Sequence, residues 1–353
     1  MTYNRAPEPG PGLRLHLNEN TAGCSAAVLA ALRTLERTDA AFYPEYAAVT
    51  SDTARALGVP AEWVQLTNGL DEGLHVVALS ARLTASPALM APDGTAFDAV
   101  IVEPAFEMYR VCASAVGGRV VPILPERNLA FPTATLLAAI TPRVRLVYLC
   151  DPNNPSGLPL PDGALGAIAQ AAPHALVVVD EAYADFSGHT AIGPALSRLR
   201  NVVVGRTFAK AHGLAGLRVG ALVAHPDTLD PLRRLLPPYN LNVCAVRALS
   251  AALQDRAYLE WYVSEAAQSR LSIERFCRRL GVTYWPSQAN FVLVRIGHDA
   301  PDLVAALASR GIYIRDRSSL PQCDGCIRIT AGVVADTERC LSAMEDFFAT
   351  RTR

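Results

Sequence analysis

The sequence predicts an α/β protein in which a mostly parallel sheet lies between helices, with a smaller α+β unit beside it. Two observations support this prediction. Short apolar, β-branched runs alternate with helical segments as far as residue 224, a pattern typical of parallel sheets covered by helices. Beyond Leu241 the pattern changes to one long helical stretch and isolated strands. The chain has 353 residues, 51% of them hydrophobic, which is enough for two domains of ordinary size.

The individual elements follow from the spacing of the apolar residues. Helices are expected at residues 25–36, 47–57, 71–83, 106–116 and 162–171. Buried strands are expected at residues 100–103, 120–124, 145–150, 176–180, 202–205 and 220–224. Between them, residues 85–98 contain prolines, a glycine and aspartates, which predicts a surface loop. The second part is expected to hold a helix at residues 255–280 and strands at 291–294 and 327–330.

Composition excludes several classes of function. The net charge is −1 and no basic stripe is present, so nucleic acid is not an expected partner. No apolar run reaches the ~18 residues of a membrane span, and the N-terminal residues lack the apolar core of a signal peptide. We therefore expect a cytoplasmic enzyme with reduced cysteines. Cys323 and Cys326 form a single CxxC with no second pair, so no metal site is expected, although an incidental disulfide is an alternative.

Lys210 lies in the segment RTFAKAHGLAGLRVG, directly after the predicted strand at 202–205. A lysine at the end of a buried strand is desolvated, which lowers its pKa and leaves a nucleophilic amine. Such amines form Schiff bases with carbonyl compounds, including pyridoxal phosphate. Thr207 and Arg218 are residue types that hold a phosphate beside that amine. The alternative is a solvated loop lysine.

Two other strands end in polar side chains that suit the same chemistry. Asp180 and Tyr183 lie at the carboxyl end of the strand at 176–180, at the sheet edge where open α/β folds bind ligands. A carboxylate there keeps a pyridine nitrogen protonated. Tyr183 and Asn154, the latter in the turn DPNNPSG, can hydrogen-bond the 3-oxygen of the same ring. The alternatives are a helix N-cap for Asp180 and an ordinary turn for Asn154.

A third feature is the turn Asn68-Gly69, which precedes the helix expected at 71–83. Backbone N–H groups at the beginning of a helix bind phosphate. The alternative is a plain glycine turn.

Taken together, these segments resemble the histidinol-phosphate aminotransferase family, within the fold-type I, class I/II pyridoxal-phosphate-dependent aminotransferases. The resemblance covers nearly the whole chain. It rests on the segments LHLNEN, YPEY, NGLDEG, EPAFEMY, DPNNPSG, VVVDEAY, RTFAKAHGLAGLRVG, PYNLN, SQANFVLV, GIYIRD and IRITAG. The resemblance implies a large cofactor-binding domain at residues 38–238 and a small domain made of residues 1–37 and 239–353.

The resemblance also implies roles for individual residues. Lys210 corresponds to the Schiff-base lysine that moves the substrate proton, and Asp180 to the partner of the ring nitrogen. Further positions match the cofactor contacts of the family: Tyr183 and Asn154 at the 3-oxygen, Phe106 stacked on the ring, and Gly69, Leu70, Asp71, Thr207 and Arg218 around the phosphate. Tyr43 corresponds to a tyrosine that reaches the cofactor of the neighbouring subunit, which implies a homodimer with a shared active site.

Three residues correspond to the substrate contacts of the family. Arg328 matches the arginine that binds the α-carboxylate of the 2-oxo acid, and Arg315 matches the arginine for the substrate phosphate. A solvated strand end is the alternative for Arg315. Asn20 lies at the mouth of the site in the family, with a capping or turn role as the alternative. One departure from the family pattern is Ala209, where serine is usual.

The reaction implied is transfer of the amino group of histidinol phosphate to 2-oxoglutarate by a ping-pong mechanism, or the reverse reaction of histidine biosynthesis, in which glutamate is the donor. An aromatic amino-acid aminotransferase is the near alternative, since it would depend on Arg328 and not on Arg315. A threonine-phosphate decarboxylase is a further alternative, because that branch shares much of the scaffold.

Overall fold

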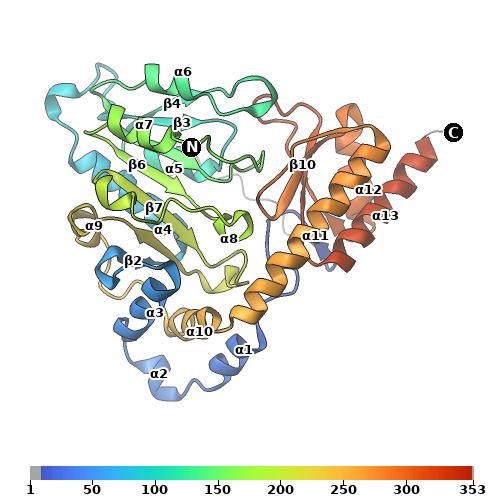
Figure 1. Ribbon diagram of the computed structural model, residues 1–353, viewed down its shortest axis with the longest axis horizontal. Coiled ribbons are helices and arrows are strands. Elements are labelled where there is room, and N and C mark those ends of the chain that lie inside the picture. Colours follow the sequence, from blue (N-terminus) through green and yellow to red (C-terminus); the bar gives the residue numbers. More distant parts are fainter. Residues whose placement is uncertain (1–8, 352–353) are drawn as a thin grey trace.

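The computed structural model describes residues 9–351, and its largest element is a seven-stranded sheet with the order β2-β8-β7-β6-β5-β3-β4 (Figure 1). Its strands are β2 Val64–Thr67, β3 Phe97–Val102, β4 Gly118–Ile123, β5 Val144–Cys150, β6 Leu176–Asp180, β7 Val202–Thr207 and β8 Gly220–Val223. The strands from β7 to β4 are parallel, whereas β8 is antiparallel to both β7 and β2. The predicted mostly parallel sheet is therefore confirmed.

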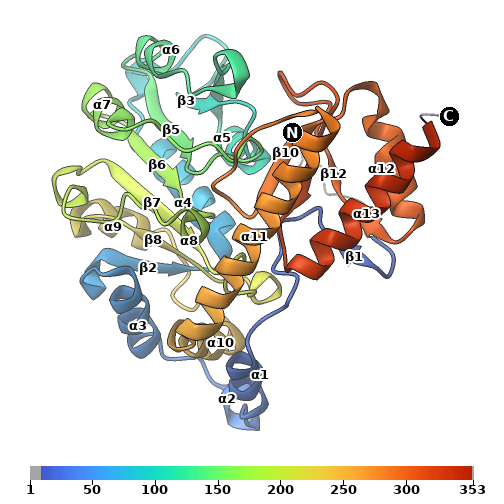
Figure 2. The ribbon, with the colours of Figure 1, turned by 45° about the vertical axis from the view of Figure 1, so that its right-hand side comes forward.

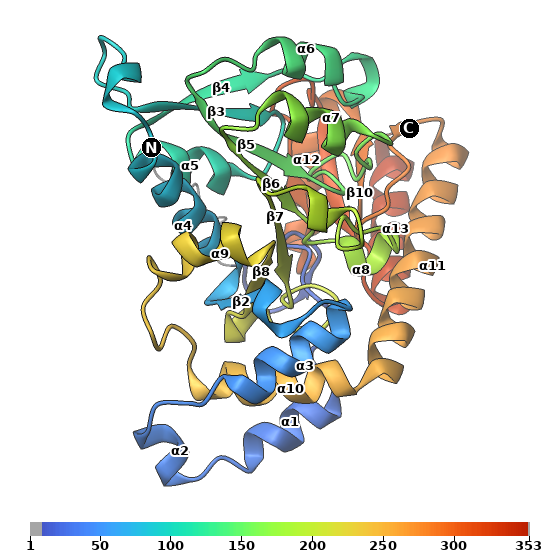
Figure 3. The ribbon, with the colours of Figure 1, turned by 60° about the vertical axis from the view of Figure 1, so that its left-hand side comes forward.

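Helices cover both faces of this sheet (Figure 3). One apolar cluster packs α4 and α5 against one face, and a second packs α7 against the other. The helices of this part are α3 Ala47–Leu57, α4 Gly69–Leu83, α5 Glu107–Ala115, α6 Thr133–Ala138, α7 Ala164–Ala171, α8 Ala184–Ser187 and α9 Pro226–Arg233. The central strands β6 and β7 are buried along almost their whole length, as continuous valine runs require.

A smaller unit is built on a four-stranded antiparallel sheet with the order β12-β13-β10-β9. A two-stranded parallel sheet joins the N-terminal segment to it, through β1 and β11 (Figure 2). The elements of this unit are β1 Leu13–Arg14, β9 Thr283–Tyr284, β10 Phe291–Arg295, α12 Ala300–Ser309, β11 Ile312–Tyr313, β12 Arg315–Asp316, β13 Cys326–Thr330 and α13 Val334–Arg351. The long helix α11, Arg256–Leu280, connects the two parts and agrees with the prediction.

The structure corrects two predicted elements. The helix expected at residues 25–36 is interrupted, because α1 ends at Arg33 and a separate short helix, α2, covers Arg37–Ala41. Glu36 is extended between them, and its N–H donates to Asp39 at 3.0 Å to begin α2. The loop expected at 85–98 ends earlier, because Phe97 and the ion-paired Asp98 are buried in β3.

Helix α10, Val243–Gln254, was not predicted, although it packs against α1 and α3 at the base of the molecule in Figure 1. Within residues 9–351 no helix is long and apolar enough to cross a membrane. All eight cysteines are free thiols, including Cys323 and Cys326, so the alternative of a disulfide there is not seen.

Candidate active site

A cavity of about 610 Å³ opens where the carboxyl ends of β5, β6 and β7 meet the N-terminal segment and the small sheet. Parallel strands bring their carboxyl ends to one edge, so polar residues that follow different strands converge there. Most of the predicted site residues line this cavity: Leu70, Asp71, Phe106, Asn154, Asp180, Tyr183, Thr207, Lys210, Arg218, Arg315 and Arg328.

Lys210 reaches this cavity from the loop that follows β7. Its Nζ donates a hydrogen bond to the backbone oxygen of Leu17 at 3.0 Å. Burial lowers the pKa of the Lys210 amine to about 8, and the nearby charge of Arg328 acts in the same direction. The uncharged amine, which is the form that attacks a carbonyl carbon, is therefore far more populated at neutral to mildly alkaline pH than in an ordinary lysine.

Asp180 is the last residue of β6 and is only 3% exposed. The hydroxyl of Tyr109 donates to its Oδ2 at 2.6 Å, and the backbone N–H of Ala182 donates to its Oδ1 at 3.0 Å. Burial nevertheless raises the pKa of Asp180 to about 6. A carboxylate that is this strongly desolvated gains free energy when a cation approaches it.

Tyr183, Asn154 and Arg328 form a connected network on the other side of the cavity. The Nδ2 of Asn154 donates to the phenol oxygen of Tyr183 at 3.4 Å. The Nη1 of Arg328 donates to the Oδ1 of Asn154 at 2.6 Å, and its Nη2 donates to the backbone oxygen of His16 at 2.7 Å. These bonds fix which atom of the Asn154 amide faces Tyr183.

The phosphate-binding prediction is centred on the beginning of α4, at Gly69. This glycine has a φ of 70°, and a Cβ placed there would lie 2.5 Å from an Arg218 nitrogen. The guanidinium of Arg218 also forms an ion pair with Asp71 at 2.7 Å. The positive φ favours glycine at this position, and glycine lets Arg218 pack directly beside the helix N-terminus, where backbone N–H groups and a guanidinium can share an anion.

Arg315 and Arg328 lie directly opposite each other on the neighbouring strands β12 and β13. Residues paired in this way place their side chains on the same face of an antiparallel sheet. Both arginines line the cavity that holds Lys210, together with Arg14 and Arg317. This end of the cavity is therefore suited to anionic groups, and two adjacent guanidinium groups suit a phosphate.

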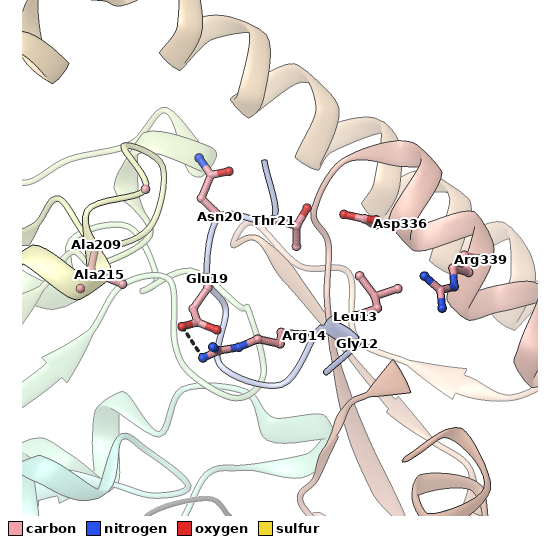
Figure 4. A pocket seen from close by; sticks show the side chains of 12 residues that line it. Gly12, Leu13, Arg14, Glu19, Asn20, Thr21, Ala209, Ala215, Asp336 and Arg339 are labelled. Carbon is pink, nitrogen blue, oxygen red and sulfur yellow. Dashed lines mark hydrogen bonds and ion pairs between the residues drawn. The ribbon is translucent and has the colours of Figure 1, made fainter. Parts of the chain in front are cut away.

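Three predicted residues are not part of the lining of the Lys210 cavity: Gly69, which adjoins it at the beginning of α4, Asn20 and Tyr43. Asn20 lines an adjoining pocket of about 500 Å³, shown in Figure 4, in which Glu19 and Arg14 form an ion pair at 2.8 Å. The Nδ2 of Asn20 donates to the backbone oxygen of Ala211 at 2.9 Å. Tyr43 is 73% exposed, lines a different pocket and stacks on Tyr239 with ring centroids 4.1 Å apart.

Sequence reasoning missed three residues of the site. Tyr109, which holds Asp180, lies within the segment EPAFEMY and one helical turn after Phe106, so its position carried a local signal. Leu17 and Asn18 contact Lys210 and Tyr183 across more than 160 positions of sequence, and no local pattern indicates such contacts.

Comparison with known proteins agrees with this geometry. The family model for aminotransferase class I and II matches residues 11–345. The chain belongs to this family. Histidinol-phosphate aminotransferase 2 of Ralstonia nicotianae is 35% identical over 348 residues, which cover 96% of this chain and 89% of that protein. Histidinol-phosphate aminotransferase of Moorella thermoacetica is 34% identical over 345 residues, which cover 96% of this chain and 86% of that protein.

Solved structures show the same likeness. Histidinol-phosphate aminotransferase from Sinorhizobium meliloti, crystallised in complex with pyridoxal-5'-phosphate, matches with a TM-score of 0.84 and 29% identity. The match covers 96% of this chain and 91% of that chain. L-threonine-O-3-phosphate decarboxylase from Porphyromonas gingivalis matches at a TM-score of 0.76 with 22% identity, which shows a shared fold. The present chain is therefore a fold-type I aminotransferase that depends on pyridoxal phosphate.

The residues of the cavity fit that cofactor. The desolvated carboxylate of Asp180 suits a pyridinium nitrogen, and the amine of Lys210 suits an aldehyde carbon. At the beginning of α4, the backbone N–H groups and the guanidinium of Arg218, which packs against Gly69, suit a phosphate.

Proposed function

We propose that the aminotransferase exchanges the amino group between histidinol phosphate and 2-oxoglutarate, and that in histidine biosynthesis the reaction runs in reverse, from glutamate to imidazole-acetol phosphate. The observation that carries this proposal is the pair Arg315 and Arg328, which lie side by side in the cavity of Lys210. One guanidinium suffices for a carboxylate, whereas two suit a dianionic phosphate. The names of the Ralstonia and Moorella relatives support the same substrate.

The proposed roles follow from the contacts of each residue. When bound, pyridoxal phosphate supplies an aldehyde carbon that joins amines and a ring that withdraws electrons from the substrate Cα. Asp180 holds the proton on the ring nitrogen, because its buried carboxylate stabilises a cation there. Lys210 Nζ removes the proton from Cα and delivers it to the cofactor's C4′, which its pKa of about 8 permits near neutral pH.

The other residues bind and orient the substrates and the cofactor. Arg328 binds the carboxylate of the 2-oxo acid, and Arg315 adds the second guanidinium needed by the phosphate of the other substrate. Phe106, at the beginning of α5, lines the cavity and stacks on the cofactor ring. Thr207 and Arg218, with the backbone N–H groups of Leu70 and Asp71, hold the cofactor phosphate.

We also propose a homodimer in the cytoplasm, in which Tyr43 completes the site of the partner. Tyr43 and its neighbour Phe42 are 73% and 72% exposed, and the Tyr43–Tyr239 stack adds a further aromatic side chain to this surface. An exposed aromatic patch is typical of a subunit interface. Asn20, in the pocket beside the cavity, is placed to meet the polar end of a substrate at the mouth of the site.

A donor panel tests the substrate. Steady-state rates with 2-oxoglutarate are measured for histidinol phosphate, phenylalanine and threonine phosphate, with the wild type and Arg315→Ala. We expect kcat/KM for histidinol phosphate to fall by about 10²-fold, as charge-assisted bonds to a phosphate require, and that for phenylalanine to change little. Equal losses on both donors would contradict the proposal and favour an aromatic aminotransferase. Release of carbon dioxide from threonine phosphate would favour the decarboxylase.

A further inference from the structure

Asn18 is buried in the active site, yet none of the roles above involves it. The side chain is only 1% exposed and belongs to the N-terminal segment that follows β1. Its Nδ2 donates to the phenol oxygen of Tyr183 at 3.0 Å, which is shorter than the 3.4 Å bond from Asn154 to the same oxygen. Asn18 is therefore the nearer of two amide donors to Tyr183.

The orientation of the Asn18 amide is fixed by Thr330. The backbone N–H of Asn18 donates to Thr330 Oγ1 at 3.1 Å, so this hydroxyl uses its own hydrogen to donate to Asn18 Oδ1 at 3.2 Å. With the oxygen held by Thr330, the amide must present its N–H₂ group to Tyr183. Thr330 is fully buried on β13, two residues from Arg328, so water does not compete for these bonds.

The backbone of Asn18 is also fixed in one conformation. Its φ is 57°, in the left-handed region that asparagine tolerates better than most residues. Its backbone oxygen accepts from the Nδ2 of Asn290 at 3.1 Å. The segment thus maintains an unfavourable backbone conformation that directs one amide at Tyr183.

These contacts determine what the phenol of Tyr183 can do. A phenol oxygen has two lone pairs and one hydrogen. Asn18 and Asn154 occupy both lone pairs, and among residues 9–351 no protein acceptor takes the hydrogen. Burial raises the pKa of Tyr183 to about 12, so the hydrogen is present at neutral pH. Arg328 opposes that rise, whereas Cys150 and Asp180 add to it.

We propose that Asn18 is a positioning residue that makes Tyr183 a hydrogen-bond donor toward the 3-oxygen of the cofactor. The inference rests on the proposed role of Tyr183. Donation from Asn18 polarises the phenol O–H, which strengthens its bond to the cofactor oxygen and stabilises negative charge there. The protein thereby lowers the pH at which the bound cofactor gains a proton.

The test is a double-mutant cycle read by the absorbance of the bound cofactor against pH. Asn18→Gly removes the amide and adopts a positive φ without strain. We expect this variant to raise the apparent pKa of the bound cofactor by about one pH unit, a tenfold change in proton affinity, the size of one hydrogen bond. In a Tyr183→Phe background the same substitution should move that pKa by less than about 0.3 units, because its target is gone.

The control is Ser25→Ala, which removes a buried capping bond from the same N-terminal region and leaves the contacts of Asn18 in place. We expect it to leave the cofactor titration unchanged. An equal effect of Asn18→Gly in both backgrounds, or the same change in Ser25→Ala, would show a general structural role and overturn the inference. Wild-type enzyme that binds cofactor and turns over donors would still uphold the proposed function, whereas wild type that binds none would refute that function itself.

Discussion

Replacing Asp180 with asparagine is expected to stabilise the cofactor-free protein while abolishing its activity. The carboxyl group is 3% exposed, and burial raises its pKa from the ordinary value of 3.8 to about 6. A group with a raised pKa contributes stability below its unfolded value, near pH 4, and loses it as the pH rises through the folded value near 6. Above about pH 7 the folded apoprotein therefore bears the whole cost of a buried negative charge.

The size of that cost follows from the two pKa values. The difference between about 6 and 3.8 corresponds to about 3 kcal/mol of unfolding free energy at neutral pH. Asparagine is uncharged at every pH. Its Oδ1 can still accept from the N–H of Ala182 while its Nδ2 donates to the hydroxyl oxygen of Tyr109, so most of this free energy should be recovered. For a chain of 353 residues, about 3 kcal/mol raises the melting temperature by about 4 °C.

The assay is thermal unfolding of the apoproteins between about pH 3 and 7.5, at one protein concentration. We expect the difference in melting temperature between Asp180→Asn and wild type to be smallest below about pH 4, to grow between about pH 4 and 6, and to stay constant above about pH 7. Asp162→Asn, an exposed turn residue, controls for the loss of one carboxylate. Parallel curves for Asp180→Asn and wild type would refute the claim that the folded apoprotein holds an unfavourable charge. Activity of the cofactor-loaded variant should fall by orders of magnitude, since the ring nitrogen loses its partner.

Two further predictions concern the cofactor and the shared site. Lys210→Ala and Tyr43→Ala should each be nearly inactive, yet mixing and reassociating them should restore about a quarter of wild-type activity, because half of the dimers carry one intact site. Mixtures that stay inactive although heterodimers are detected by mass would contradict a shared site. Ala209→Ser should bind pyridoxal phosphate about 2- to 10-fold more tightly in fluorescence titrations, since it adds one hydroxyl beside Thr207. Unchanged affinity would place residue 209 outside the phosphate site.

The parts of the site that sequence reasoning predicted share one property. Asp180, Asn154 and Lys210 each follow an apolar strand of a parallel sheet, and the geometry of such sheets brings the carboxyl ends of strands together. A local pattern therefore carried three-dimensional information. The same reasoning predicted the mostly parallel order of the large sheet and the long helix α11, because long and strongly patterned elements depend least on distant contacts.

The predictions that were wrong concern elements whose limits depend on particular contacts and not on a local pattern. The break between α1 and α2 depends on one extended residue, Glu36, and its bond to Asp39, which periodicity does not register. Phe97 and Asp98 were assigned to a loop because prolines and a glycine precede them, whereas Arg119 and Arg143 satisfy the buried charge of Asp98 from other elements. In both cases, single side-chain contacts determined where the element begins or ends. The division into domains at residues 38 and 238 stays a prediction.

The N-terminal segment shows why some functional contacts cannot be found from side-chain patterns. His16 and Leu17 meet Arg328 and Lys210 through backbone oxygens, which every residue type possesses. The identity of those side chains is therefore uninformative about the contacts. A substrate anion on Arg328, or a carbonyl carbon on Lys210, must compete with these same oxygens. Ligand binding and the position of the N-terminal segment are consequently linked. A ligand that displaces His16 from Arg328 also alters the stability of the bond between Leu17 and Lys210, and the reverse holds as well.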